Sequence, residues 1–266
     1  MELVRPAVAR PLLAGCLLLV AAAVPRARAT SASPPPARSA ERAPARVLDY
    51  TVEQVFEDSL AASGGRARLA RLVAIRGVGS LRHQDGSVEH WREQRTAPGN
   101  ADYSDGCYAI SIHVDAHGAS ELEYEHGNWH PVSGGELEDD ALDARFDRDL
   151  RWRESFREAR LLGVADFDGQ PAYAVRLVTH GGRVRTRFFS VTSHLEIGYE
   201  EQVTIADRHR DDATSVPSPF TFRVGYTDFR TVNGVVLPFR TIRHAAVDYF
   251  DELERTWDSY ELEFAP

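Results

Sequence analysis

The chain has 266 residues, of which 43% are hydrophobic and 27% are charged, and its formal net charge is −9. This length accommodates one large domain or two small ones. The acidic balance excludes a protein built to bind nucleic acid or an anionic membrane surface.

The first 29 residues have the composition of an export signal. Two arginines precede the 13-residue apolar stretch Leu12 to Val24, and Ala27-Arg28-Ala29 follows it. This order of basic, apolar and small residues predicts a signal peptide over residues 1–29 that is cleaved after Ala29. The apolar stretch is shorter than the roughly 20 residues that span a bilayer, and we expect no transmembrane segment in the mature chain. Cleavage removes four Arg and one Glu, so the formal charge moves from −9 to −12.

The same segment contains a second processing motif. Leu13-Ala14-Gly15-Cys16 spells a lipobox, at which a lipoprotein would be acylated on Cys16. Most of the apolar stretch follows Cys16, whereas the apolar region of a lipoprotein signal precedes the cysteine, so simple export is favoured. The expected location is therefore periplasmic or secreted, and a membrane-anchored lipoprotein is the alternative.

The cysteine content indicates that the hydrophobic core, rather than a disulfide, stabilises the fold. Cys107 is the one cysteine that remains after cleavage, so the mature chain has neither an intramolecular disulfide nor a thiolate metal site. Residues 30–46 hold Pro, Ala, Ser and Arg without a large apolar residue, which predicts a disordered linker. Residues 47–266 are expected to form a single domain large enough to bury a core.

The folded part is expected to open with a helix. Thr51-Val-Glu-Gln54 has the pattern of a capping box, apolar residues recur after it at helical spacing, and Gly64-Gly65 supplies a stop. A second short turn of helix is expected over residues 66–73.

From residue 74 the apolar period approaches two. The pattern predicts antiparallel strands at 74–83, 87–95, 107–114, 119–125, 128–132, 159–166, 171–179, 183–191, 195–205, 220–230, 235–247 and 252–264. Residues 136–158 interrupt it, and Leu142, Phe146 and Leu150 have the spacing of a helical stripe. The predicted fold class is α+β and mainly antiparallel β. A sheet this long must curl, which gives a half-open β-barrel with one or two covering helices.

Catalytic and metal-binding motifs are weak. His113 with His117 and His126 with His130 have a spacing that holds zinc on a helix, but both pairs straddle predicted turns. Exposed loop histidines explain the pattern as well. No nucleophile or nucleotide motif is present, and Cys107 reads as a small packing residue. We therefore expect a protein that is not an enzyme, with no catalytic residue, metal or cofactor.

Four short motifs carry a family resemblance by their order. They are residues 56–72 with their Gly-Gly break, Gly127-Asn-Trp129, Asp168-Gly-Gln-Pro-Ala-Tyr-Ala-Val175, and Tyr226-Thr-Asp-Phe-Arg-Thr-Val-Asn-Gly-Val-Val-Leu-Pro-Phe-Arg240. Together they resemble the LolA/LolB superfamily of periplasmic lipoprotein carriers. The resemblance implies a non-enzymatic protein that binds acyl chains. It also implies that helices at 51–73 and 137–158 form a lid.

Aromatic residues are the best candidates for a binding role. Any single one is explained by ordinary core packing, but a curled sheet with an unfilled apolar concave face forms a lipid-sized cavity. The candidate ligand-lining residues are Trp91, Tyr103, Tyr124, Trp129, Trp152, Phe189, Phe229 and Leu237.

The expected function is that of an exported carrier or sensor. Its ligand would be a lipid, a lipoprotein acyl chain or another apolar molecule, and an envelope protein is a further expected partner. One alternative is a structural or interaction domain of the cell envelope with a filled cavity. The other is a metal-dependent hydrolase that uses the loop histidines.

The Asn233-Gly234 pair predicts a hairpin whose register depends on the loop. A two-residue loop sets Arg230 across from Leu237, whereas a three-residue loop pairs Phe229 with Leu237. We favour the three-residue loop because it pairs apolar with apolar residues. Pro238 cannot donate to a sheet ladder, so its strand is expected at an edge or with a bulge.

Overall fold

A capping box starts the folded part of the chain, as the sequence predicts. In the computed structural model, the hydroxyl of Thr51 accepts a hydrogen bond of 3.2 Å from the Gln54 amide, and the Gln54 side chain accepts one of 2.8 Å from the Thr51 amide. Helix α1 (Val52–Ala62) follows. It ends before Gly64 and Gly65, whose φ angles of 127° and 87° suit glycine. Helix α2 (Arg66–Leu69) is a single turn.

The structure describes residues 50–97, 99–104, 109–115, 118–125, 128–204, 219–245 and 253–266. They belong to one compact unit of the chain, Ala43–Pro266. The signal peptide, the linker, Cys107, His117, His126 and residues 207–218 of the charged loop lie outside the described residues.

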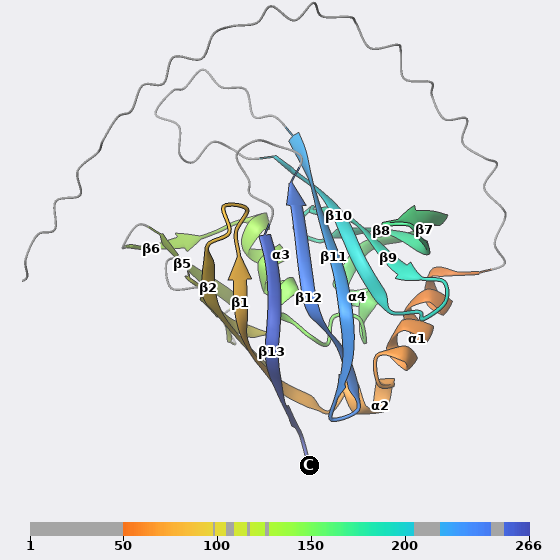
Figure 1. Ribbon diagram of the computed structural model, residues 1–266, viewed down its shortest axis with the longest axis horizontal. Coiled ribbons are helices and arrows are strands. Elements are labelled where there is room, and N and C mark those ends of the chain that lie inside the picture. Colours follow the sequence, from red (N-terminus) through yellow and green to blue (C-terminus); the bar gives the residue numbers. More distant parts are fainter. Residues whose placement is uncertain are drawn as a thin grey trace, which may run out of the picture. The chain divides into compact units, whose positions relative to one another are not determined.

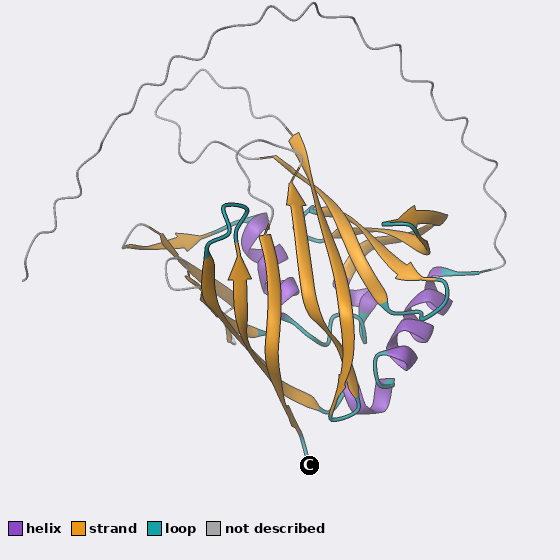
Figure 2. Cartoon of the chain, viewed as in Figure 1, coloured by secondary structure: helices purple, strands orange, loops and turns teal. Residues whose placement is uncertain are grey.

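Within these residues, thirteen strands form one antiparallel sheet (Figures 1 and 2). They are β1 Leu72–Arg82, β2 Val88–Thr96, β3 Asn100–Ser104, β4 Ala109–Asp115, β5 Gly118–Glu125, β6 Asn128–Val132, β7 Phe156–Phe167, β8 Gln170–Thr179, β9 Val184–Ser190, β10 Glu196–Thr204, β11 Pro219–Val232, β12 Val235–Ala245 and β13 Leu253–Phe264. Helices α3 (Gly135–Ala144) and α4 (Trp152–Ser155) connect β6 to β7.

The chain starts in the middle of the sheet and fills its two halves in turn. The strand order is β6-β5-β4-β3-β2-β1-β13-β12-β11-β10-β9-β8-β7, so the pairing of β1 with β13 joins the halves and β6 and β7 are the free edges. The sheet is therefore open, and the predicted fold class is confirmed.

Contacts of α3 show that the sheet curls. Ala144 of α3 packs with Ala101 of β3 and Ile112 of β4, near one edge of the sheet. Asp143, one residue earlier, forms ion pairs with Arg183 and with Arg185 of β9, near the other edge. One helix reaches both regions only if the sheet bends around it, so α3 lies on the concave side.

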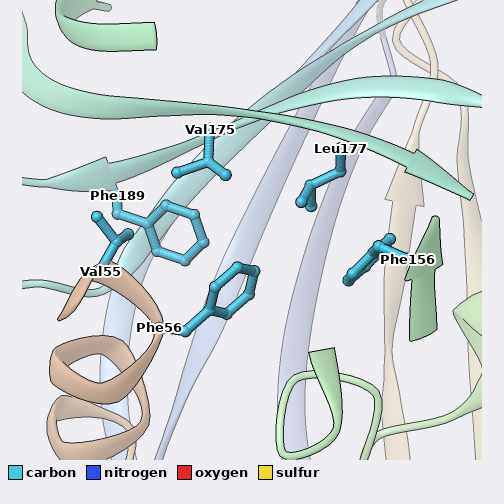
Figure 3. Packing of buried hydrophobic residues seen from close by; sticks show 6 residues of the cluster. All are labelled: Val55, Phe56, Phe156, Val175, Leu177 and Phe189. Atoms are coloured by element: carbon cyan, nitrogen blue, oxygen red, sulfur yellow. The ribbon is translucent and has the colours of Figure 1, made fainter. Parts of the chain in front are cut away.

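Helix α1 covers the β7–β9 end of the sheet. Val55 and Phe56 point from the helix towards a cluster of buried side chains on the strands (Figure 3). The Phe56 ring stacks on Trp152 of α4, with centroids 5.1 Å apart and planes within 6°, and it meets the edge of Phe189. Aromatic packing thus joins α1, α4 and β9 into one unit.

The late hairpin has the loop that we did not favour. Val232 pairs with Val235 and Arg230 with Leu237, so the loop has two residues and the predicted three-residue loop is wrong. Asn233 and Gly234 have φ angles of 49° and 79°, as a type I′ turn requires. This turn matches the twist of the strands, and its geometry outweighs the apolar pairing that we expected.

The prediction of an edge position or a bulge at Pro238 is wrong. Strand β12 lies inside the sheet, between β11 and β13, and its described ladders have no register shift at Pro238. However, β12 pairs with β13 only from Arg240 to Arg243, and Pro238 lies beyond that ladder. The carbonyl of Pro238 instead accepts a hydrogen bond of 3.1 Å from the hydroxyl of Tyr260. The seam between β12 and β13 is therefore open beside Pro238.

Two further predictions need correction. Strand β3 was not predicted, because the alternation in Asn100–Ser104 covers only five residues and depends on Ala101 and Tyr103 alone. The helical stripe through Leu142, Phe146 and Leu150 is wrong, because α3 ends at Ala144 and Arg145 is extended. Residues 145–151 then form turns that lead into α4.

Candidate functional site

The concave side of the sheet holds a cavity of about 440 Å³. Its walls come from strands of both halves of the sheet and from the segment between α3 and α4. Apolar side chains in the wall are Leu81, Leu195, Val224, Phe229, Val236, Leu253 and Trp257; the tyrosines are Tyr103, Tyr199, Tyr226 and Tyr260; the charged side chains are Glu93, Arg95, Asp143, Arg148, Arg185, Glu196, Arg243 and Arg255. The cavity therefore has an amphipathic lining.

An ion-pair network lies where α3 meets β9. Both oxygens of Asp143 accept hydrogen bonds from Arg185, at 3.0 and 2.9 Å, and Arg183 and Arg148 bind the same carboxylate. Burial by itself raises the pKa of Asp143, but the three guanidinium groups outweigh it and hold this pKa well below its usual range. Asp143 is thus an anion at neutral pH, and it ties α3 to the strands.

A second network holds the segment that follows α3. Arg187 of β9 is 2% exposed and donates to both Asp149, at 2.7 and 2.6 Å, and Glu196. Its guanidinium lies 5.1 Å from the Phe189 ring centroid and 5.7 Å from that of Phe56. The acidic partners satisfy this buried cation, and the aromatic rings enclose it.

The tyrosines contribute neutral groups to the cavity. Burial raises the pKa of Tyr103, Tyr199, Tyr226 and Tyr260 above the ordinary value of a phenol. Each side chain is therefore protonated at neutral pH and offers an apolar ring with a hydroxyl at its tip. Such a wall suits an amphipathic ligand better than a purely apolar one.

Arg255 occupies a different setting from the other cavity arginines. It lies on β13, paired with Leu81 of β1, and its guanidinium carbon is 3.8 Å from the Trp91 ring centroid. The Nε atom is buried and has no hydrogen-bond partner. Burial lowers the pKa of Arg255, because the charged form is desolvated.

The predicted ligand-lining residues are distributed over several environments. Tyr103 and Phe229 line the cavity. Trp91 lies behind Arg255, and Leu237 packs against the same cluster as Trp91. Trp152 and Phe189 belong to the core beside α1. Tyr124 and Trp129 pair with each other across β5 and β6, and their side chains lie outside the described part. A role in binding stays a prediction for all of them.

Sequence reasoning missed the charged lining. Arg183, Arg185 and Arg187 alternate along β9, and a period of two places such side chains on one face of a strand. Acidic residues of 139–149 are the partners of these arginines. An alternating run of arginines together with an acidic helix was the available signal.

No metal-binding group of three or more His, Cys, Asp or Glu residues is found among the described residues. His113 is exposed, and its expected partner His117 is outside that part of the chain. No helix in the described ranges is long and apolar enough to cross a membrane.

Comparison with known proteins identifies the fold. No protein family matches the chain, and no curated protein matches it by sequence. Among solved structures, the chain is similar to a LolA superfamily protein from Nitrosomonas europaea, with 13% identity over 82% of this chain and 96% of that chain and a TM-score of 0.51.

Two further structures have the same fold. An outer-membrane lipoprotein-sorting protein domain from Vibrio parahaemolyticus is 8% identical over 79% of this chain and 91% of its own, with a TM-score of 0.50. A DUF1329 family protein from Desulfovibrio piger is 8% identical over 80% and 93%, with a TM-score of 0.52. The chain is therefore an open, curled antiparallel sheet protein with a fold similar to that of these proteins.

Proposed function

We propose that the protein is an exported, non-enzymatic carrier or sensor that binds a lipid, a lipoprotein acyl chain or another apolar ligand in its half-barrel cavity. The observation that carries the proposal is the cavity of about 440 Å³ on the concave side of the sheet. Ligand sites in proteins have about 300–1,000 Å³. Two proteins with the same fold, a LolA superfamily protein and a lipoprotein-sorting protein domain, support this class.

The wall beside the open seam is the place for an acyl chain. Val236 and Pro238 of β12 face the cavity together with Trp257 and Tyr260 of β13 and Leu81 of β1. Each methylene that leaves water for this wall contributes roughly 0.8 kcal/mol. The alternative, an envelope interaction domain, requires a filled concave face, and the free volume weighs against it.

The movable part of the site is the segment from α3 to α4. Helix α1 buries Val55 and Phe56 in the core, and of its flank only Ser63 reaches the cavity wall. The segment 135–155 instead reaches the cavity through Asp143 and Arg148 and is held by ion pairs as well as by the apolar contacts of Ala144 and Trp152. It carries charged side chains that face the cavity, and it is the lid of our proposal.

Binding of a fluorescent fatty acid to delipidated protein tests the function. We expect saturable binding at micromolar concentration. Thr241→Phe places a ring in the cavity wall and should weaken binding at least about tenfold, because it removes space for the ligand. Thr231→Phe is the matched control, since Thr231 is exposed on the neighbouring strand and outside the wall. Absence of saturable binding in the wild type contradicts the proposal.

Export and anchoring are the second part of the proposal. The protein would act in the periplasm or outside the cell, and an envelope protein would deliver or receive its ligand. Mass spectrometry of the mature N-terminus tests the route. A start at Thr30 gives a free shuttle, whereas a diacylated Cys16 gives an anchored form, and an unprocessed Met1 contradicts export.

A further inference from the structure

Arg255 is a cation in the cavity wall without an acidic partner. The structure records no carboxylate within 4.0 Å of its guanidinium among the described residues, and Nε makes no hydrogen bond. Its guanidinium carbon lies over the Trp91 ring, 3.8 Å from the centroid, and 5.9 Å from the Trp257 ring centroid. Two indoles therefore fix the position of the charge.

Neighbouring cavity arginines are already neutralised. Arg95 binds Glu93 at 2.6 Å, Arg148 binds Asp143 at 2.5 Å, and Arg185 binds Glu201 at 2.6 Å. Glu93 is the acidic residue that most favours the charge of Arg255, but it is engaged with Arg95. Arg255 is thus available to a group that enters the cavity.

We infer that Arg255 anchors the anionic group, a carboxylate or a phosphate, of an amphiphile whose apolar part lies against Leu81, Val236 and Trp257. The inference deepens the proposed carrier function and rests on it for the apolar part. A guanidinium binds either anion through two parallel hydrogen bonds.

The physical reason is the cost of an unpaired, partly buried charge. A desolvated cation is unfavourable unless an anion and hydrogen bonds compensate it. Burial lowers the pKa of Arg255, which reports the same cost. The contact with Trp91 reduces the cost, but the buried Nε–H group stays without an acceptor. An entering anion would supply an acceptor and an opposite charge. The compensated desolvation cost of Arg255 would then add to the binding free energy of the anion.

A pair of probes that differ only in charge tests the inference. The probes are a fluorescent fatty acid and its methyl ester, titrated into wild type, Arg255→Gln and Arg240→Gln. Arg240 is exposed and outside the cavity wall, so it is the matched control. We expect the wild type to prefer the acid by at least about tenfold, as hydrogen bonds to a charged group require. Arg255→Gln should bind both probes alike, while Arg240→Gln should keep the preference.

A further arm separates a lipid headgroup from a free anion. Inorganic phosphate and acetate are titrated by calorimetry into the same proteins. Equal binding of acid and ester to the wild type overturns the Arg255 anchor and leaves the carrier function standing. Binding of the free anions alone, lost in Arg255→Gln, supports the anchor and contradicts the carrier function. Absence of all binding overturns both.

A second variant covers the event that Arg255→Gln does not fold. Arg255→Lys keeps the charge but loses the planar group that stacks on Trp91 and the paired donors. We expect it to retain a preference for the acid that is several-fold smaller than that of the wild type. A preference equal to the wild type's contradicts the proposed guanidinium geometry. Thermal unfolding of each variant checks that the fold is intact.

Discussion

The guanidinium of Arg187 binds the carboxylate of Asp149 through two hydrogen bonds, of 2.7 and 2.6 Å. The pair joins β9 to the turn between α3 and α4, and Arg187 is only 2% exposed. A buried charge with its partner in a connecting segment makes the position of that segment depend on the charge. The lid of the proposed function is therefore held by buried ion pairs in addition to the apolar contacts of Ala144 and Trp152.

Removal of Arg187 should be strongly destabilising. In Arg187→Met, the carboxylates of Asp149 and Glu196 remain without their shared cation, and breaking a buried pair costs about 3–5 kcal/mol. Urea unfolding measures the loss. Arg76→Met is the control, because Arg76 makes a longer exposed pair of 3.5 Å with Glu263, and its effect should stay within about 0.5 kcal/mol. Equal losses of unfolding free energy in the two variants would contradict a stabilising role of the buried Arg187 ion pairs.

Acid should loosen the link between α3 and β9. The folded-state pKa of Asp143 lies well below its usual range, although burial opposes this, because Arg185, Arg148 and Arg183 surround it. A lowered folded-state pKa stabilises the fold above the ordinary Asp pKa of about 3.9, and the contribution is lost as pH falls through the lower folded value.

The variant Asp143→Asn gives the measurement. The difference in unfolding free energy between wild type and Asp143→Asn should be constant between about pH 5 and pH 8 and should shrink below about pH 4. Denaturant unfolding at a series of pH values records it. A difference that grows towards low pH would contradict the assigned direction of the pKa shift.

Close approach of two strands makes Gly79 intolerant of a side chain. A Cβ atom at Gly79 would lie 2.1 Å from the carbonyl oxygen of Thr256 and 2.9 Å from Cα of Trp257. Gly79→Ala should therefore cost at least about 1–3 kcal/mol, since the β1–β13 pairing must shift. Gly225→Ala is the control, because among the described residues the added Cβ would meet only Asp168 Oδ2, at 3.4 Å. A similar melting temperature for both variants contradicts this prediction.

The stability of variants at Asn233 should depend on how well the new residue adopts the left-handed backbone conformation of the turn. Asn233 has a φ of 49°, in the left-handed region. Glycine and asparagine adopt this conformation at low energy, whereas β-branched residues are strained in it. Asn233→Val should destabilise the protein by roughly 1–3 kcal/mol, while Asn233→Gly should be nearly neutral. Thermal unfolding compares the two. Equal tolerance of Val and Gly would indicate a different turn.

Local features of the fold were predictable because they depend on residues that are close in the chain. The capping box at Thr51 and Gln54 places the first helix by itself, and Asn233-Gly234 places the last hairpin. The order of motifs led to the LolA-like fold, which the comparison with solved structures supports. The hairpin register was missed because turn twist, rather than apolar pairing, decides the loop.

The candidate site was less predictable, because its walls come from strands far apart in the sequence. Of the predicted lining residues, Tyr103 and Phe229 reach the cavity, whereas Trp152 and Phe189 fill the core next to α1. An aromatic side chain in a strand has the same local pattern in either place. Its surroundings follow from the curl of the sheet, which the sequence pattern does not specify.

The sequence by itself determined the helix start and most of the strands, because these depend on residues that are close in the chain. Short motifs also supported the export signal and the family resemblance as expectations. Only the tertiary structure placed Arg255 of β13 over Trp91 of β2, with no acidic partner among the described residues, and Asp143 of α3 among arginines at and before the start of β9. The curl of the sheet brings these distant residues together. Because burial makes an unpaired charge costly, Asp143 is stabilised by its arginine partners, whereas Arg255 is the position at which we propose that an anion binds.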